Sequence, residues 1–257
     1  TINPSQWSNK TGIKKLLSHF YNQTNFLIDN EQKRTNNSFN LNPLDIDETI
    51  LLGLNFSLRN RLYLNRNKNN YSVIFTYAAS KNKRLYNIGN QENKTKLHQL
   101  EFSHKLSTFW LFDFKTSISK DEVITENFNN QNYKIDAYEI APKFTFKYSK
   151  NHQFSFFYNY KNKENNITSL TTLAQQKLGS SYYYKSTKNT LIRAEFNLFH
   201  NDFTGIQNSP VAYQMLEGLQ AGRNYTWSLV YQQKINSFIN LNINYLGRKG
   251  ENSNTIH

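Results

Sequence analysis

Apolar and polar residues alternate with a period of two through most of this chain. Between Ile50 and Leu64 nearly every even position is apolar, whereas the odd positions include Arg59 and Arg61. A helix would spread this pattern around its circumference, but a strand places it on one face. Because the pattern returns many times, the sequence predicts an all-β chain. The expected strands are 13–28, 49–65, 71–80, 96–105, 109–119, 132–147, 153–162, 171–185, 190–202, 222–234 and 239–249.

Two of these ranges carry local exceptions to a plain strand. Residues 13–20 also fit an amphipathic helix capped by Thr11, so the first strand has a helical alternative. In 132–147 the apolar parity changes from odd to even, which predicts a bulge near Ala137. Pro142 has no backbone N–H to donate, so we expect one lost or bulged ladder hydrogen bond there.

Short polar turns and longer polar stretches alternate between the expected strands. The longer stretches lie near 81–95, 120–131, 164–170, 203–221 and 249–253, and we expect 203–221, with Pro210 and Gly218, to be free of helix. Short turns at one end and longer loops at the other are typical of transmembrane barrels. The expected strands, of ten to seventeen residues, also exceed the usual ~5–6.

The fold class predicted from these features is an antiparallel transmembrane β-barrel of about twelve strands, or part of a larger barrel. Short turns would face the periplasm and longer loops the outside. We expect residues 1–12 to be a linker or the end of a preceding region. Residues 13–257 would form the barrel domain, cut before its last strand is complete.

Charge separation between the two strand faces tests this prediction. The chain carries a net charge of +13, and Lys or Arg facing the centre of a bilayer costs ~2–4 kcal/mol. We therefore expect the apolar faces to avoid ionised groups and the opposite faces to line a basic lumen. Asp136 is assigned to that lumen together with the main candidates, which are Arg59, Arg61, Glu101, Lys105, Asp113, Lys115, Glu139, Lys143, Lys147, Lys161, Arg193 and Glu195.

Aromatic residues make up 15% of the chain, and many of them fall on the apolar faces. Tyr and Trp prefer membrane interfaces, where one end of the ring is wet. The predicted interface aromatics are Tyr71, Tyr77, Trp110, Tyr148, Tyr158, Tyr160, Tyr182, Tyr184, Trp227, Tyr231 and Tyr245, with Tyr133 beside them. A soluble sheet packed on a core would explain the alternation, but neither the long strands nor these aromatics.

Residues 203–257 carry a resemblance to a known class of proteins. The segment from Gln214 to Trp227 leads into Tyr231-Gln-Gln-Lys-Ile235 and Leu241-Asn-Ile-Asn-Tyr-Leu-Gly-Arg248. It resembles the C-terminal barrel region of large outer-membrane β-barrel proteins of Gram-negative bacteria. The resemblance implies a barrel fold and an integral outer-membrane location. It implies little about cargo, because members range from uptake receptors to export and scaffold components.

Catalytic and cofactor motifs are weak in this sequence. The chain has no Cys, which excludes disulfides, thiolate metal sites and Cys nucleophiles. No Gly-x-Ser-x-Gly is present, and no His stands at motif-like spacing from a Ser and an acid. Asp45, Asp47 and Glu48 are weak candidates for holding Ca²⁺ in an outer loop, because a solvated polar loop with an acidic residue at the strand entry is the better explanation. We predict no cofactor. Basic residues are spread over all strands rather than gathered in one stripe, which argues against nucleic acid.

The functional hypotheses follow from the barrel. The leading one is a non-enzymatic outer-membrane barrel that acts as a passage or docking scaffold, with a net basic lumen. Its partners would be outer-membrane lipid and lipopolysaccharide, and a protein at the outer loops or a plug domain. One alternative is the barrel of a plug-gated, energised uptake receptor. Another is an outer-membrane hydrolase with a Ser/His site at the rim.

Overall fold

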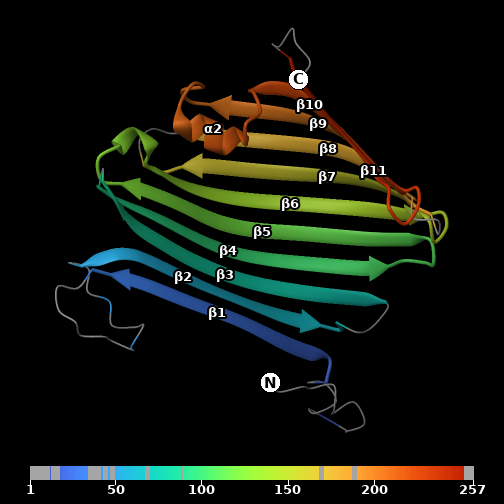
Figure 1. Ribbon diagram of the computed structural model, residues 1–257, viewed down its shortest axis with the longest axis horizontal. Helices are drawn as coiled ribbons and strands as arrows, with labels where there is room; N and C mark the ends of the chain where they lie inside the picture. The colour runs from blue at the N-terminus through green and yellow to red at the C-terminus, as the bar shows by residue number, and fades with distance from the viewer. Residues whose placement is uncertain are drawn as a thin grey trace.

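The computed structural model describes residues 12, 18–33, 42, 46, 50–66, 70–87, 89–167, 171–186 and 190–251. Eleven antiparallel strands form one sheet, and each strand pairs with its neighbours in sequence (Figure 1). The strands are β1 (Phe20–Gln32), β2 (Leu51–Leu64), β3 (Tyr71–Tyr86), β4 (Gly89–Lys105), β5 (Trp110–Thr125), β6 (Tyr133–Lys147), β7 (His152–Asn165), β8 (Thr171–Lys185), β9 (Thr190–Thr204), β10 (Gly222–Lys234) and β11 (Asn240–Gly250). A short 3-10 helix η2 (Asn129–Gln131) precedes β6, and helix α2 (Pro210–Leu216) lies between β9 and β10. The prediction of an all-β, antiparallel chain is confirmed.

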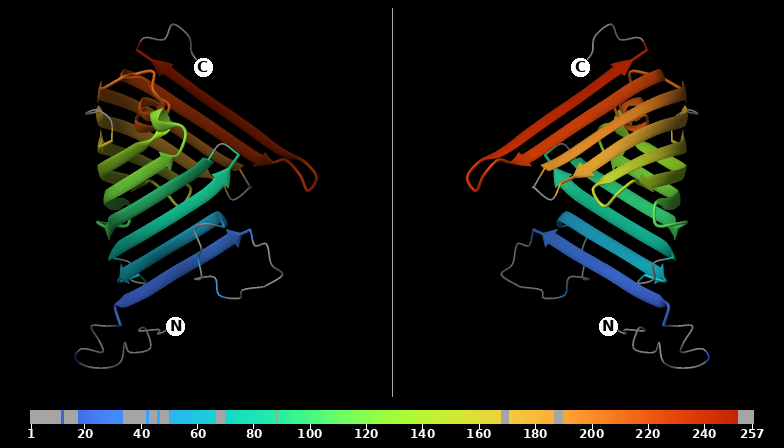
Figure 2. Two further views of the ribbon diagram at one scale, coloured as in Figure 1. Left: turned by 90° about the vertical axis from the view of Figure 1, so that its left-hand side faces the viewer. Right: turned by 90° about the vertical axis from the view of Figure 1, so that its right-hand side faces the viewer.

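The sheet is curved, and helix α2 sits in the hollow of the curve (Figures 1 and 2). We call the face that carries α2 the inner face and the opposite one the outer face. We call the end of the sheet that bears α2 the helix end. The opposite end, with connections 65–70, 106–109, 148–151, 186–189 and 235–239, is the turn end. Among the described residues, β1 pairs only with β2 and β11 only with β10, so the two edge strands are not joined.

The registers keep each apolar set on one face of the sheet. Phe112 lies opposite Phe144, which lies opposite Phe156, and Phe154 lies opposite Tyr182. The rings of Phe112 and Phe144 are 4.7 Å apart between centroids, and those of Phe154 and Tyr182 are 4.8 Å apart. Cross-strand aromatic pairs of this kind stabilise a sheet and fix its register. They form a continuous apolar band on the outer face.

Helix α2 corrects the prediction that 203–221 would be free of helix. Ser209 caps the helix by accepting a hydrogen bond from the Ala212 amide at 3.1 Å, and Pro210 occupies the first turn. Pro is suited to this position because its missing N–H has no helical partner there. The helix ends at Glu217, which adopts a left-handed conformation with φ of 55°. Its buried side chains are Val211, Ala212, Met215 and Leu216.

The predicted bulge near Ala137 is absent from strand β6, so this prediction was wrong. The register of β6 with β5 runs without a shift from Tyr133 to Phe146. Tyr133, Ile135 and Ala137 therefore stay on the inner face, where Ile135 is buried beside Leu173 in the cluster under α2. The apolar residues at odd positions face the inner side because helix α2 packs over them there. A register shift is therefore not needed to explain them. The ladder between β6 and β7 is interrupted at 141–142, next to Pro142, as expected.

The prediction of a polar loop at 81–95 was wrong, because strands β3 and β4 extend through most of this stretch. β3 continues to Tyr86 and β4 begins at Gly89, so nearly all of this stretch is paired strand. Both faces are polar here, and ion pairs replace apolar contacts. Lys81 lies 3.5 Å from Glu92, and Lys94 contacts Glu92 as well. β5 likewise extends through 120–125, part of the second predicted loop.

The buried apolar core of the described residues is small and lies mainly under α2. Its main cluster consists of Ile135, Leu173 and the four buried side chains of α2, and the other buried apolar side chains are Leu51, Leu54 and Tyr63 of β2. Far more large apolar side chains are exposed than buried, most of them on the strands. In the described part of the chain, no helix combines the length and apolar character that crossing a membrane would require.

Candidate functional site: the inner face of the sheet

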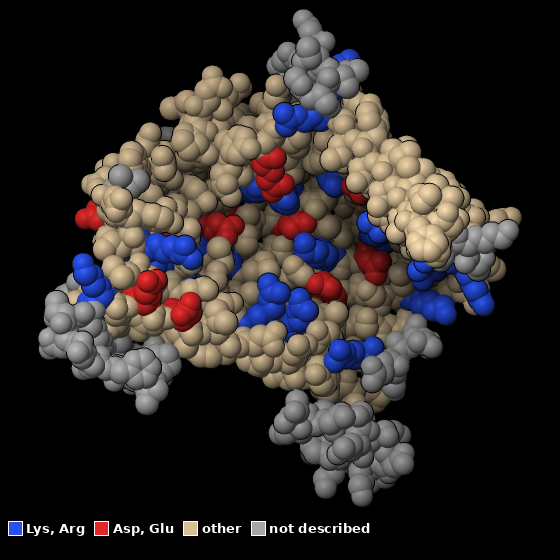
Figure 3. Space-filling model, viewed as in Figure 1, with Lys and Arg blue, Asp and Glu red and all other residues tan. Residues whose placement is uncertain are grey.

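The twelve residues predicted to line a lumen all lie on the inner face. Lys115 pairs with Glu139 across β5 and β6, and the strand parity carries the others to the same side. Figure 3 shows this face as a hollow in which Lys and Arg gather with Asp and Glu. That the face lines a lumen stays a prediction. Among the twelve, basic residues outnumber acidic ones.

Ion pairs and amide hydrogen bonds cross the middle of the inner face. The Lys115 ammonium lies 3.4 Å from the Glu139 carboxylate, which also accepts a hydrogen bond from the Asn159 amide at 2.6 Å. Lys177 of β8 lies 3.7 Å from Glu195 of β9, three strands further along the sheet. These contacts neutralise part of the basic excess and hold the side chains against the sheet.

Two lysines of β7 clamp the C-terminal end of α2. The Lys161 and Lys163 ammonium groups each donate to the Glu217 carboxylate at 2.8 Å. Lys163, which is buried, also donates to the Met215 carbonyl at 2.8 Å. Cations at this position donate to the free carbonyls of a helix C-terminus and are attracted to the negative end of the helix dipole. The helix is thereby fixed to the inner face by apolar packing and by charge.

The two ammonium groups also set the protonation of Glu217. Burial alone would raise the pKa of this carboxyl. The hydrogen bonds from Lys161 and Lys163, together with their charges, outweigh burial and hold the pKa below its ordinary value. Glu217 is therefore ionised at neutral pH.

A polar cavity of about 200 Å³ lies between α2 and strands β5 to β7. Its lining includes Asp121, Glu139, Lys161, Lys163 and Glu217. Both signs of charge meet in a small volume here, and most of these groups are already engaged with one another. The ion pairs among these groups hold α2 against the sheet.

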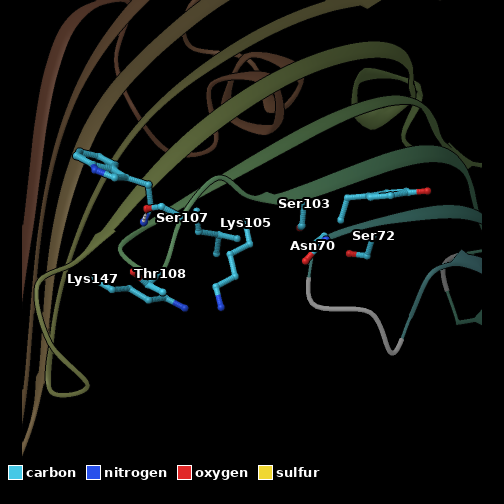
Figure 4. Close-up of a pocket in the computed structure, with 10 residues that line it drawn as sticks. Asn70, Ser72, Ser103, Lys105, Ser107, Thr108 and Lys147 are labelled. Atoms are coloured by element: carbon cyan, nitrogen blue, oxygen red, sulfur yellow. Dashed lines mark hydrogen bonds between the residues drawn. The ribbon is translucent and has the colours of Figure 1, made fainter.

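A second cavity, of about 400 Å³, opens on the inner face at the turn end of the sheet (Figure 4). It is formed by the start of β3, the β4–β5 turn and the end of β6. Its polar lining side chains are Asn70, Ser72, Ser103, Lys105, Ser107, Thr108 and Lys147. The volume falls in the range of small-molecule sites.

The predicted interface aromatics lie outside the hollow. Strand parity places them on the outer face, except for Tyr148, which lies in the turn after β6 and is 69% exposed. Two assignments were wrong. Tyr133 lies on the inner face and packs against the cluster under α2, while Asp136 lies on the outer face, 3.4 Å from Lys120.

Charged residues on the outer face gather toward the helix end. Lys94, Lys96, Lys120 and Asp136 share the parity of the apolar band but lie nearer that end. The expectation of an outer face without ionised groups therefore holds only toward the turn end. Ion pairs account for part of this exception, because Lys120 pairs with Asp136 and Lys94 with Glu122, whereas Lys96 lies opposite Lys120 in the register of β4 and β5.

The metal candidates Asp45, Asp47 and Glu48 lie outside the described residues. Within the described part of the chain, no group of three or more His, Asp or Glu side chains is arranged to hold a metal ion.

Lys163 and Glu217 were missed from the sequence for definite reasons. The seventh strand was expected to end at residue 162, so Lys163 fell just outside it, whereas β7 continues to Asn165. Glu217 belonged to a loop assumed to have no helix. Ser209-Pro210, followed by apolar residues at 211, 212, 215 and 216, was the available signal for a capped amphipathic helix.

In comparisons with known proteins, no family model and no curated protein matches this chain.

Proposed function

We propose that this chain is the transmembrane part of a bacterial outer-membrane β-barrel that acts as a passage or docking scaffold, without enzymatic activity. The observation that carries the proposal is the division of the sheet into an exposed apolar outer face and a charged inner face. Phe156 and Leu178 are each 58% exposed, and Ile118 is 54% exposed, all on the outer face. In water such a continuous apolar surface would be an aggregation liability.

Lipid is the covering that this outer face fits best. No second layer of the described residues packs on the apolar band, so a soluble sandwich is not formed by this part of the chain. A bilayer would cover the band, and the Tyr and Trp rings suit its interfaces. Lipopolysaccharide and other anionic lipids fit the lysines above the band toward the helix end.

Strand length supports the same proposal. The described strands have 11 to 17 residues, whereas a tilted transmembrane strand needs about 9–11. The excess lies at the helix end of β3 to β5, where both faces are polar. Strands that cross a bilayer and continue outside it would show this distribution. The resemblance of residues 203–257 to outer-membrane barrel regions agrees with it.

The inner face supports a passage or a docking wall. Its charged groups would contact water or a protein, and α2 would narrow the hollow at the helix end. An open passage with a basic excess should prefer anions. The clamp on α2 favours the docking version, because a fixed helix closes part of the hollow.

Heat-modifiable migration tests the barrel. The full chain, refolded in detergent, should migrate faster in SDS gels before boiling than after it, because a closed barrel resists SDS until heated. Identical migration would contradict the proposal.

Planar-bilayer recordings then separate the two versions. Discrete conductance steps with anion preference support the passage, whereas insertion without steps supports the docking scaffold. Steps with cation preference would contradict the proposed basic lumen.

A further inference from the structure

The cavity at the turn end of the inner face contains cations that are not used elsewhere. Among the residues that the structure describes, neither Lys105 nor Lys147 is paired with a carboxylate. Lys115, Lys161 and Lys163 on the same face all have acidic partners. In Figure 4 the Lys105 and Lys147 side chains extend into the same space. Two unneutralised ammonium groups in one cavity favour an anionic occupant.

The backbone fixes both lysines where their strands end. The Lys105 amide donates to the Asn70 carbonyl at 2.8 Å, and the Lys147 amide donates to the Phe109 carbonyl at 2.7 Å. These hydrogen bonds tie the end of β4 to the start of β3, and the end of β6 to the start of β5. Only the side chains of the two lysines therefore remain to be ordered by a ligand.

Neutral donors surround the two ammonium groups. The Ser107 oxygen accepts from the Phe109 and Trp110 amides at 3.2 and 3.1 Å, which leaves its hydroxyl hydrogen to donate. Ser72 and Thr108 add hydroxyl groups to the lining. Ser103 is not counted, because its hydroxyl donates to the Asp113 carboxylate at 2.6 Å.

We propose that this cavity binds the phosphate group of a soluble solute, with Lys105 and Lys147 as its charged contacts. A phosphate group carries roughly −1.5 to −2 charges at pH 7, which matches two ammonium groups. Its several acceptor oxygens can engage donors from three sides at once, and Lys is a common phosphate ligand. The volume of about 400 Å³ leaves room for the solute that carries the phosphate.

This inference deepens the proposed function, because it names a class of ligand for the inner face. It rests on the proposed function in one respect, which is that solutes must reach the cavity through the hollow of the barrel. The probe is inorganic phosphate, titrated into the full ¹⁵N-labelled chain in a non-ionic detergent. Amide shifts of Ser107 and Thr108 should saturate. Sodium chloride and acetate, at matched ionic strength, should produce weaker and non-saturating shifts.

The double variant Lys105→Gln/Lys147→Gln should weaken phosphate binding at least about tenfold, since losing one charge-assisted hydrogen bond has an effect of this size. Each single variant, Lys105→Gln and Lys147→Gln, is compared with the matched control Lys185→Gln, which also removes one charge at the turn end of the inner face but lies outside the cavity lining. The control should change the affinity less than about twofold.

Heat-modifiable migration is recorded on the same sample. Failure of the barrel proposal can therefore be distinguished from failure of the phosphate-site proposal. A saturable, lysine-dependent phosphate response supports the cavity whether or not the chain behaves as a membrane barrel. Equal responses to phosphate and acetate, no saturation, or equal weakening by Lys185→Gln would overturn it even if the barrel is confirmed.

Discussion

At the scale of single residues, the attachment of α2 depends on Lys163. Its ammonium joins the Glu217 carboxylate and the Met215 carbonyl, and its side chain is only 10% exposed. We expect Lys163→Met to lower the free energy of unfolding by about 1–3 kcal/mol, because two acceptors lose a charged donor. The matched variant Lys115→Met, at a side chain 40% exposed, should cost less than about 1 kcal/mol. Urea unfolding in detergent measures both, and equal losses would contradict the clamp.

The same clamp predicts a pH dependence. The pKa of Glu217 is lower in the folded chain than its ordinary value of about 4.3. Its contribution to stability should therefore be complete above that value and be lost as the pH falls through the lower, folded pKa. Protection factors of the amides of residues 211–216, which correct for the intrinsic pH dependence of exchange, should fall as the pH drops below the ordinary carboxyl pKa. The Glu217→Gln variant should exchange faster already at neutral pH and show a smaller step. A step of unchanged size in that variant would assign the pH dependence to another group.

At the scale of elements, β10 offers a direct comparison of the two faces. Leu229 lies on the outer face and Val230, its neighbour, on the inner face. In lipid vesicles, Leu229→Lys should cost ~2–4 kcal/mol, because it places a charge in the bilayer. Val230→Lys should cost less, since the inner face already carries charges. A soluble sheet predicts the reverse order, because Leu229 is 40% exposed and Val230 is more buried. Unfolding of both variants from vesicles decides between them.

The strands were predictable where alternation and turn residues agreed. β8 and β10 have the expected bounds of 171–185 and 222–234, because one face is apolar and polar turns follow. The helix ends of β3 and β4 were missed because both faces are polar at 81–95, which removes the period-two signal.

Helix α2 and the inner apolar patch were not predictable in the same way. The apolar residues of β6 at 133, 135 and 137 looked like a change of register, because the element that covers Ile135 comes from 210–216, far away in sequence. Local pattern indicates which residues are apolar, but not which distant segment covers them. The same holds for the cavity at the turn end, which assembles residues of three hairpins.

At the scale of the whole molecule, the account depends on what covers each face of the curved sheet. The described residues cover the inner face in part, through α2, and leave the outer face bare (Figures 1 and 2). The edge strands β1 and β11 each retain an unpaired side among the described residues. Unpaired edges are costly in a bilayer, so the proposed barrel requires them to be joined to each other or to further strands.

A single-cysteine scan of β5 in lipid vesicles tests the central claim most directly, and the absence of Cys from the chain leaves no background. A fluorophore is attached in turn at residues 112 to 116, and quenching by nitroxide lipid is compared with quenching by aqueous iodide. We predict that lipid quenches at 112, 114 and 116, and that iodide quenches at 113 and 115. Iodide quenching at every position, or quenching without a period of two, would contradict a sheet that spans the membrane with its apolar face in lipid.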